Sequence, residues 1–466
     1  MAKVHLPVVE PGSMQSSLRS DGSRNWVQPA DVTGRFSRAR KLVFVLLIAW
    51  WAILPWLRVD GRPALQLDVE HRRFFLFGAT LNAQDTYLLF FLLTGIGFSL
   101  ILVTTLLGRV WCGWSCPQTV FLEGMFRPLE RILEGTREAR IRRDAGPWTL
   151  DKTVRKTVKH LAFVVLAAFV AHVFVGYFVS TKALFQMMRR SPGEHPETFA
   201  WAFALTAIFY GNFAWFREQL CIGLCPYGRL QSVLIDKDSL VVGYDTQRGE
   251  PRGKAKDTST KHGDCIDCKR CVVVCPTGID IRNGLQLDCV ACTACIDACD
   301  EIMVKVGKPV GLVRYDSASG FEGAGKKLLR PRVFVYVALM VIGAIVATVS
   351  FRRRTDFEAN LLRVQGIPFV VEGPLVKNAF TIHLVNKSSQ KMRYLIEPEA
   401  SAGLVFDIPL ADPEVESMSG ITLPVTITTA RAGFVQRGIR IKIRNVTTGK
   451  SEVMAAGTLL GPMGGL

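Results

Sequence analysis

Two runs of four cysteines between residues 265 and 299 decide the organisation of this 466-residue chain. They read Cys265-Ile-Asp-Cys268-Lys-Arg-Cys271-Val-Val-Val-Cys275-Pro and Cys289-Val-Ala-Cys292-Thr-Ala-Cys295-Ile-Asp-Ala-Cys299. The spacing C-x2-C-x2-C-x3-C is typical of bacterial ferredoxins with two [4Fe-4S] clusters, in which the fourth cysteine of each run binds the other cluster. We therefore expect one cluster at Cys265, Cys268, Cys271 and Cys299, and a second at Cys275, Cys289, Cys292 and Cys295.

A zinc ribbon and a disulfide knot are the alternatives for these eight cysteines. Zinc sites usually have two cysteine pairs with a longer spacer, and disulfides do not persist in the cytosol. Asp300 follows the second run where a proline follows the first, which departs from the ferredoxin pattern without removing a ligand. The two-cluster interpretation explains the spacing better than either alternative.

The rest of the chain is hydrophobic and basic, with 49% hydrophobic residues and a net charge of +17. This composition excludes a disordered chain, a collagen and a small disulfide scaffold. Five apolar runs approach the length of about 20 residues that crosses a bilayer. We expect transmembrane helices at Leu42–Leu57, Tyr87–Leu107, Leu161–Val179, Phe199–Phe216 and Val333–Phe351.

The distribution of Lys and Arg predicts the orientation of these spans. Residues 108–160 carry 11 of them, whereas residues 58–86 carry 4 and residues 180–198 carry 3. Because cytoplasmic loops are enriched in Lys and Arg, the N-terminus, residues 108–160 and residues 217–332 should be cytoplasmic. The C-terminus should then be periplasmic.

The other four cysteines form two copies of one motif, Cys112-Gly-Trp-Ser-Cys116-Pro117 and Cys221-Ile-Gly-Leu-Cys225-Pro226. Each copy follows the second span of a hairpin and precedes an amphipathic stretch, which indicates a parallel internal repeat. If the turn is helical, the two cysteines share one face, and the proline suits the first turn of the next helix. The four thiols could converge at the cytoplasmic membrane surface as a Cu(I) site, a further metal cluster or a thiol/disulfide pair, or they could simply pack the interface.

Several other groups are weaker candidates for functional sites. His160 and His172 are twelve positions apart and lie on different helical faces, so bis-histidine haem ligation is disfavoured. Met187, Met188 and His195 could contact copper, but interfacial anchoring explains the two methionines better. A run of six arginines between residues 127 and 143 is explained by anionic lipid or by topology rather than by nucleic acid. The chain contains no GxxxxGK[ST] or GxGxxG motif, so nucleotide binding is not indicated.

After residue 351 the chain is rich in β-branched residues and turn signals and has no cysteine. Short strands at this spacing predict an immunoglobulin-like sandwich without the inter-sheet disulfide, suited to contact with another protein. We expect strands at Phe369–Val371, Phe380–Val385, Met392–Ile396, Leu404–Ile408, Ile421–Thr428 and Ile439–Ile443.

Together these features predict an α-helical membrane protein with five transmembrane helices, a cytoplasmic two-cluster ferredoxin-like insert and a periplasmic immunoglobulin-like β-sandwich. The expected boundaries are a cytoplasmic N-terminal segment at 1–41, a four-helix membrane domain at 42–231, the ferredoxin-like domain at 232–332, the fifth helix at 333–351 and the sandwich at 352–466.

With these motifs in place, the chain resembles the FixG/RdxA/CcoG family of cytochrome c oxidase accessory proteins over nearly its whole length. The resemblance is carried by Gly34-Arg35-Phe36, Pro55-Trp56-Leu57, Trp111-Cys112-Gly113-Trp114-x-Cys116-Pro117-Gln118-Thr119, Cys225-Pro226-Tyr227, the eight-cysteine insert and the C-terminal sandwich. The duplicated Cys-x3-Cys-Pro hairpins make this combination much more specific than the eight cysteines alone.

The resemblance implies an iron-sulfur protein of the bacterial inner membrane that assists assembly of a cbb-type haem-copper oxidase by reducing Cu(II) to Cu(I). Its expected partners are membrane lipid, oxidase subunits or copper chaperones, and an electron donor. Two alternatives remain open, a quinol-dehydrogenase-type electron conduit to a periplasmic partner and a non-enzymatic assembly scaffold. In the metalloreductase hypothesis, Cys112, Cys116, Cys221 and Cys225 receive the copper.

Overall fold

The computed structural model describes residues 26–462, except 60, 71–72, 82–84, 254–261, 325–328, 353–354, 389, 400 and 450–451. The chain forms two compact units, one up to Ile345 and one from Val346. Most of the predicted N-terminal segment 1–41 lies outside the described residues. The first helix begins at Arg35, which is inside that predicted segment.

Five helices of the described chain are long and apolar enough to cross a membrane, as the sequence predicts. They are α1 (Arg35–Ile53, extended by η2 at Leu54–Trp56), α2 (Thr86–Leu107), α7 (Leu150–Val175), α9 (Pro196–Gly211) and α15 (Pro331–Arg352). The helix α7 begins well before the expected Leu161. Thr149 explains this early start, because its side chain caps the helix by accepting a hydrogen bond from the Lys152 N–H.

The cysteine motifs of the two predicted repeats follow α2 and α9. After α2 come α3 (Val110–Trp114), α4 (Pro117–Phe121), the π-helical η4 (Leu122–Phe126), α5 (Arg127–Glu134) and α6 (Arg137–Ala145). After α9 come the π-helical η6 (Asn212–Phe216) and η7 (Leu220–Leu224), and then α10 (Pro226–Leu234). Pro117 and Pro226 both occupy the first helical position, as predicted.

The connections from α1 to α2 and from α7 to α9 contain small elements that the sequence did not predict. Three strands, β3 (Leu65–Asp68), β4 (Arg73–Leu76) and β5 (Ala79–Leu81), pair in order, and β1 (Arg58–Val59) pairs with β2 (Arg62–Pro63). The helix α8 (Thr181–Met187) and the short η5 (Pro192–Glu194) connect α7 to α9.

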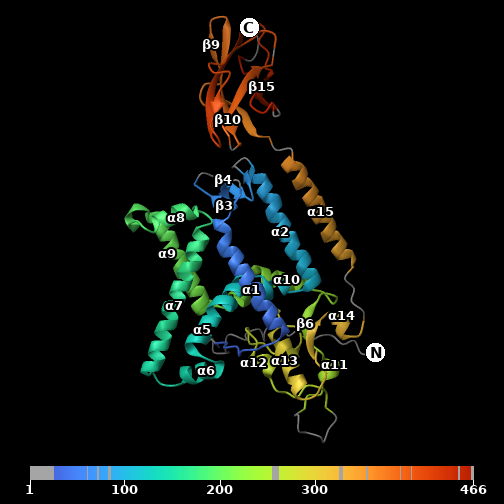
Figure 1. The fold of residues 1–466 in the computed structure, drawn as a ribbon. Coiled ribbons are helices and arrows are strands. Elements are labelled where there is room, and N and C mark those ends of the chain that lie inside the picture. The colour runs from blue at the N-terminus through green and yellow to red at the C-terminus, as the bar shows by residue number, and fades with distance from the viewer. Residues whose placement is uncertain are drawn as a thin grey trace. The chain divides into compact units, whose positions relative to one another are not determined.

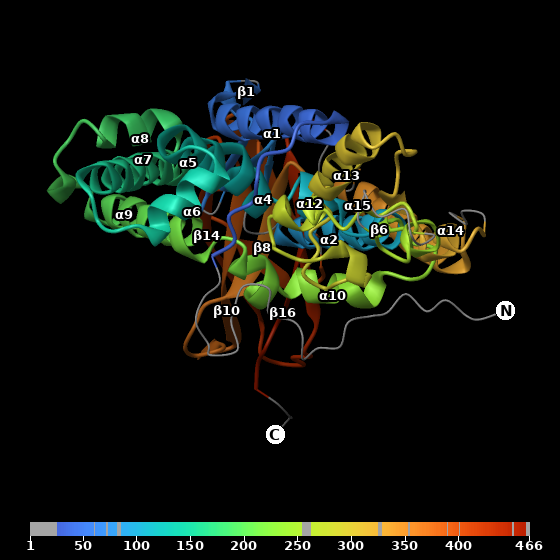
Figure 2. The same ribbon diagram turned by 90° about the horizontal axis from the view of Figure 1, so that it is seen from below.

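The cysteine-rich insert is enclosed by an antiparallel pair of strands, β6 (Val241–Tyr244) and β7 (Val313–Asp316). Between them lie α11 (Thr246–Gly249), α12 (Arg270–Val273), η8 (Ile281–Asn283) and α13 (Ala294–Lys305), and α14 (Ala318–Phe321) follows. Figure 1 shows α12, α13 and β6 gathered at one end of α1 and α2. The Phe36 and Ser37 N–H groups at the start of α1 donate to the Asp297 carboxylate of α13, which fixes this contact. In Figure 2, seen from below, α13 lies beside α1.

The second unit is a two-sheet sandwich, which confirms the predicted fold. One sheet has the order β12-β14-β10-β8 with β9 also on β10, and the other has the order β13-β11-β15-β16. Alternate residues of both sheets point into one core that includes Phe357, Ile382, Tyr394 and Ile441. The strands are β8 (Phe357–Arg363), β9 (Val370–Glu372), β10 (Leu375–Asn386), β11 (Met392–Pro398), β12 (Leu404–Asp407), β13 (Glu414–Val415), β14 (Gly420–Ala430), β15 (Gly438–Asn445) and β16 (Glu452–Thr458).

Candidate metal centres

The first candidate centre is a cavity of about 360 Å³ in the cysteine-rich insert. The loop that leads into α12 contributes two of its cysteines and α12 itself a third, and α13, further along the chain, contributes the fourth. The structure thus brings together the four ligands expected for the first cluster, although their ligation stays a prediction. They are Cys265, Cys268, Cys271 and Cys299.

The second candidate centre is a neighbouring cavity of about 340 Å³. Cys275 reaches it from the end of the first run, as the ferredoxin pattern requires. Its lining includes the remaining set of expected ligands and also Cys271, which therefore stands between the two cavities. The expected set is Cys275, Cys289, Cys292 and Cys295.

Both cysteine loops have the same backbone, which explains why spacing alone predicts them. Asp267 and Lys269 in the first loop have φ angles of 49° and 55°, and Ala291 and Thr293 in the second have 52° and 65°. The two pairs occupy equivalent positions, one on each side of the second cysteine of their run. Non-glycine residues rarely adopt this left-handed conformation, and such strain concentrates at functional sites. Here it curls each loop so that its three thiols face one cavity.

The donor set of each cavity fits a polynuclear iron-sulfur cluster. Burial raises the pKa of Cys271, Cys292 and Cys299 to about 12, so these thiols are protonated at neutral pH until a metal displaces the protons. Among the described residues, no three Cys, His, Asp or Glu side chains converge closely enough to hold a single metal ion. The four thiols of each cavity surround it without converging on one position. This arrangement suits a cluster of several iron ions better than a single zinc ion, which is the alternative interpretation.

The third candidate centre is formed by the cysteines of the two repeats. Cys112 lies in α3 and Cys221 in η7, whereas Cys116 and Cys225 are extended residues that precede α4 and α10. The turn is therefore not one continuous helix, and the conditional prediction of a shared helical face does not apply. The chain leaves the helix because each proline restricts the cysteine before it to an extended backbone.

The four thiols of the repeats are nevertheless close neighbours. Burial and, to a smaller extent, the proximity of Cys116, Cys112 and Cys225 raise the pKa of Cys221 to about 12. Burial likewise raises the pKa of Cys112 to about 12, and its Sγ donates to the Gln231 Oε1 at 3.2 Å. Within the described chain, the thiols do not converge on one ion. A soft metal ion could bind two of them, or all four after a small rearrangement.

The third centre touches the loop of the second at Gly113, the residue after Cys112. A Cβ atom placed on Gly113 would lie 2.5 Å from the Ala291 carbonyl oxygen and 2.7 Å from that of Val290. Real Cβ atoms do not approach oxygen this closely, so only glycine fits. The backbone beside Cys112 therefore packs directly on the loop between Cys289 and Cys292.

Two arginines fasten this contact. Arg109, just after α2, donates to the carbonyl oxygens of Leu287 and Cys289, the latter at 3.1 Å, and to that of Gly228 at 2.8 Å. Arg40 of α1 donates from Nε to the Gly113 carbonyl oxygen at 2.8 Å. The sequence analysis missed Gly113, Arg40 and Arg109, because their roles depend on partners that are distant in the sequence.

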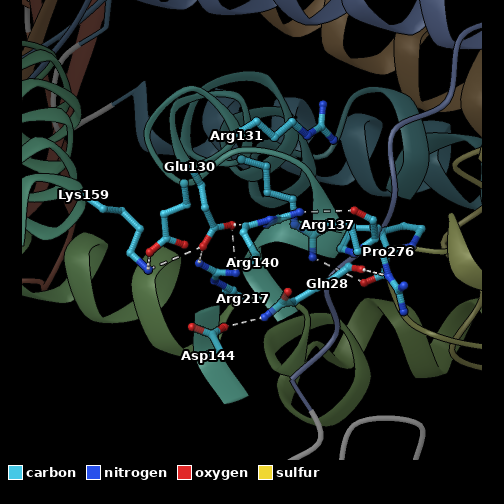
Figure 3. Close-up of polar contacts among 12 residues, drawn as sticks. Gln28, Glu130, Arg131, Arg137, Arg140, Asp144, Lys159, Arg217 and Pro276 are labelled. Carbon is cyan, nitrogen blue, oxygen red and sulfur yellow. Dashed lines mark hydrogen bonds and ion pairs between the residues drawn. The ribbon is translucent and has the colours of Figure 1, made fainter. Parts of the chain in front are cut away.

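A buried network of charges joins the two repeats beside these centres (Figure 3). Glu130 of α5 pairs with Arg217 at 2.8 Å and Arg140 at 3.1 Å. Burial alone would raise the pKa of Glu130, but the neighbouring cations, Arg217 first, hold it at about 2. Arg127 pairs with Glu218 at 3.3 Å and donates to the Pro276 carbonyl oxygen at 3.4 Å, next to Cys275.

This network corrects the interpretation of the basic run. Arg127 is 2% exposed and Arg140 is 4% exposed, so neither contacts lipid headgroups. Arg131 pairs with Asp31, and Arg137 donates to the Gln28 carbonyl oxygen. Glu123 pairs with Arg127, which lies one helical turn later, and this ion pair helps to keep the arginine buried.

Both histidines of α7 have hydrogen-bond partners within the described chain. The His160 Nδ1 bonds to the Tyr210 hydroxyl at 3.0 Å, and the His172 Nδ1 bonds to the Ala168 carbonyl oxygen at 2.7 Å. Met187 ends α8, and His195 precedes α9. No group of three metal-binding side chains includes these histidines among the residues the structure describes.

Comparison with family models divides the chain in the same way. Residues 216–318 match a 4Fe-4S dicluster domain, and residues 347–462 match the IG-like fold at the C-terminal of FixG. Residues 88–135 match a 4Fe-4S binding domain. That segment contains only two cysteines, Cys112 and Cys116.

Comparison with known proteins finds relatives that match most of the chain. The protein RdxA of Cereibacter sphaeroides is 34% identical over 86% of this chain and 87% of its own length. The nitrogen fixation protein FixG of Rhizobium meliloti is 34% identical over 78% of this chain and 77% of its own length. The protein RdxB of Cereibacter sphaeroides is 33% identical over 92% of both chains.

Proposed function

The chain belongs to the FixG/RdxA family of iron-sulfur proteins, and we propose that it passes single electrons from two [4Fe-4S] clusters to Cu(II) held by the four thiols of its repeats. The family models and relatives support electron transfer through iron-sulfur clusters. Copper as the substrate rests on thiol chemistry and on the family resemblance. The product, Cu(I), would serve assembly of a cbb-type haem-copper oxidase.

The observation that carries this proposal is the contact at Gly113. The backbone next to Cys112 lies against the Ala291 and Val290 carbonyl oxygens, inside the loop that should hold the second cluster. Arg109 donates hydrogen bonds both to the Cys289 carbonyl oxygen and to the Gly228 carbonyl oxygen in α10, and so connects the two segments. The expected donor and the expected acceptor are thus linked by short, packed protein segments.

The chemistry of the side chains supports copper as the acceptor. When bound, each cluster supplies one electron, so two reduced clusters balance the reduction of two Cu(II) ions to Cu(I). Thiolates bind Cu(I) in preference to harder ions. Cys112, Cys116 and Cys221 are held as thiols by burial, so copper binding there releases protons and leaves the product ion bound by sulfur.

The orientation proposed for the protein follows from its charges. The 11 Lys and Arg of residues 108–160 favour a cytoplasmic position for the thiols of the repeats, and the clusters would lie at the same end of α1 and α2. The sandwich, whose first strand begins at Phe357, would then be periplasmic, where it could bind an oxidase subunit or a copper chaperone.

The test is an anaerobic copper titration of the purified protein in detergent. After its clusters are reduced with dithionite and the excess is removed, Cu(II) is added in the presence of a Cu(I) chelator. We expect one Cu(I) for each cluster reoxidised in the parent protein. Cys112→Ser and Cys225→Ser should keep both clusters and lose most of the copper reduction.

Ser115→Ala is the matched control, because it alters the same turn without removing a thiol. Copper reduction at the parental rate in both cysteine variants would remove the repeat thiols from the mechanism. Clusters that stay reduced in the parent protein would reject direct copper reduction.

A quinol is the second candidate redox partner, and a groove at the start of α7 favours it. Trp148, Lys156 and His160 line this groove, and His160 bonds to the Tyr210 hydroxyl. A quinol oxidised there would give two protons and two electrons, one electron for each cluster. Reduction of the oxidised clusters by a soluble quinol, lost in His160→Phe but not in His172→Phe, would support this function.

An assembly scaffold is the remaining alternative, favoured by the sandwich being a compact unit of its own. Truncation after Phe351 would then abolish oxidase assembly, while Cys292→Ser in the otherwise folded chain would not. The reverse pattern would reject the scaffold.

A further inference from the structure

The two candidate cluster cavities differ in the charges beside them. Arg282 is the buried cation that lines the first cavity, and two carboxylates bind it, those of Asp280 at 2.6 Å and of Asp267. The carboxylate of Asp300, the residue after Cys299, lies beside the same cavity and accepts from the Gly311 N–H. Two carboxylates therefore pair with this buried cation, and a third lies beside the cavity at Cys299.

Two further cations line the first cavity, but both reach solvent. Lys269 is exposed, and Arg270 donates to the Asp31 carbonyl oxygen in an exposed hydrogen bond. Water screens such charges far more strongly than it screens buried ones. Their influence on the cavity is correspondingly weaker than that of a buried arginine.

The second cavity is flanked by two arginines whose hydrogen bonds, within the described chain, go to carbonyl oxygens. Arg109 is 8% exposed and bonds to Leu287, Cys289 and Gly228. Arg40 is 9% exposed, bonds to Gly113, and keeps a buried Nη2 without a hydrogen-bond partner in the part of the chain that the structure describes. Asp288 is the carboxylate close to Cys289.

Arg40 lies near the second cavity, because it lines a pocket together with residues that flank the thiols of that cavity. A pocket next to α1 is lined by Arg40 together with Val274, Pro276 and Ala294. The first two of these partners flank Cys275, and the third lies between Cys292 and Cys295.

The other charged groups that line this pocket are Lys41, Arg131 and Glu123. Glu123 pairs with Arg127, and the nearby Arg40 guanidinium also helps to lower its pKa, whereas Arg131 pairs with Asp31. Among the described residues, Arg40 and Lys41 are therefore the cations of this pocket without a direct ion pair, and Lys41 is exposed.

Arg40 and Arg109 thus place two buried positive charges beside the second cavity. Arg40 lies against the residues that flank Cys275, and Arg109 donates to the Cys289 carbonyl oxygen.

We propose that Arg40 and Arg109 raise the reduction potential of the second cluster above that of the first and so direct electrons toward the thiols of the repeats. A cluster gains one negative charge on reduction, and nearby buried cations without a direct ion pair favour that reduced form. The carboxylates around the first cavity have the opposite effect. Electrons would arrive at the first cluster, where Cys268 is exposed, and leave from the second, which lies against Gly113.

This inference deepens the proposed function, but its test needs no copper. The full-length protein in detergent is titrated with redox mediators, and the two clusters are followed by electron paramagnetic resonance. In Arg40→Gln, the ratio of reduced to oxidised second cluster at a fixed potential should fall about tenfold, equivalent to about 59 mV for a one-electron couple. Arg40→Lys should retain most of the parental value.

Arg282→Gln is the matched control, because it removes the buried cation beside the first cavity. It should lower the potential of the other cluster and leave the signal affected by Arg40→Gln unchanged. Arg109→Gln provides a second test and should shift the same signal as Arg40→Gln.

The proposal is overturned if Arg40→Gln and Arg109→Gln, each with full iron content, leave both potentials unchanged, or if they shift the same cluster as Arg282→Gln. It is also overturned if the cluster sensitive to Arg40 has the lower potential in the parent protein. These outcomes are independent of copper reduction, so failure of the copper titration would leave them interpretable.

Discussion

Each candidate cluster cavity and the cysteine turns of the membrane repeats gather four thiols, but they do so by different means, since three of the four thiols of each cavity come from one loop. Each cluster loop is shaped by its own backbone, with left-handed residues at the same two positions in both copies. The thiols of the repeats meet only because two segments that are distant in the sequence pack together. A site shaped by one loop should survive substitutions elsewhere in the chain. A site formed by packing should depend on the contacts that hold the two segments together.

The largest effect should come from a cluster ligand. Cys292→Ser removes one of four thiols from the second cavity, and we expect loss of about four of eight irons and of nearly all copper reduction. Iron analysis and the copper titration measure both quantities. Because the four expected ligands of the first cluster are all retained, the first cluster should remain, and loss of all eight irons would show that the two clusters depend on each other.

Breaking the buried charge network should affect the repeats and spare the cluster loops. Glu130→Gln leaves Arg217, Arg140 and Lys159 buried around a neutral side chain, and we expect a loss of about 3–5 kcal/mol in the free energy of unfolding at pH 7. Thermal unfolding in detergent measures it. Glu301→Gln is the control, since Glu301 forms an exposed pair with Lys305 that is worth about 0.3–0.5 kcal/mol.

The pH dependence of this loss is fixed by the lowered pKa of Glu130, which is about 2 in the folded chain against an ordinary value of 4.5. A lowered pKa stabilises the fold above pH 4.5, and this stabilisation disappears as the pH falls toward 2. The difference between the parent and Glu130→Gln should therefore shrink over that interval. A difference that stays constant from pH 7 to pH 3 would mean that the charge of Glu130 is not responsible.

Gly113→Ala tests the contact between the two groups of thiols. The added methyl group must push the Cys112 turn away from the Ala291 and Val290 carbonyl oxygens, and we expect copper reduction to slow by about tenfold or more, because short-range transfer depends on this packing. Gly223→Ala is a matched control, since Gly223 lies in the second cysteine turn and has open space around it. Equal rates in the two variants would contradict a path through Gly113.

The last prediction concerns the protons that copper binding displaces. Since burial raises the pKa of Cys112 and Cys221 to about 12, Cu(I) binding to these thiols must displace protons at neutral pH. The apparent affinity should rise about tenfold per pH unit for each proton displaced between pH 6 and pH 8. Competition with a Cu(I) chelator measures it, and an affinity independent of pH would argue against thiol ligation.

The difference between locally built and packed sites also explains how far the sequence could predict the structure. The grouping of the eight cysteines around two cavities was predictable because C-x2-C-x2-C fixes a local loop, and the duplicated motif predicted that the other two cysteine pairs would lie close together. Gly113, Arg40 and Arg109 were not predictable, since their partners lie 73 to 180 residues away. Lipid contact by Arg127 and Arg140 is excluded by their burial, which charge alone does not reveal, whereas the topological explanation of the basic run stays a prediction.

The sandwich shows a related limit. Six of its strands were predicted from β-branched runs, whereas β8, β13 and β16 were missed. In β8, Phe357, Ala359 and Leu361 alternate inward, but Glu358 and Asn360 between them weaken the strand signal. Pairing with β10 supplies the hydrogen bonds that make this segment a strand.

The most direct measurement of electron transfer to copper is an anaerobic stopped-flow experiment. The dithionite-reduced protein, freed of excess reductant, is mixed with Cu(II) and a Cu(I) chelator, and cluster absorbance and Cu(I) formation are recorded together. We predict that both signals change with the same rate and in a ratio of one Cu(I) per cluster, and that Cys225→Ser slows both. Reoxidation of the clusters without Cu(I), or an unchanged rate in Cys225→Ser, would contradict transfer to copper at the thiols of the repeats.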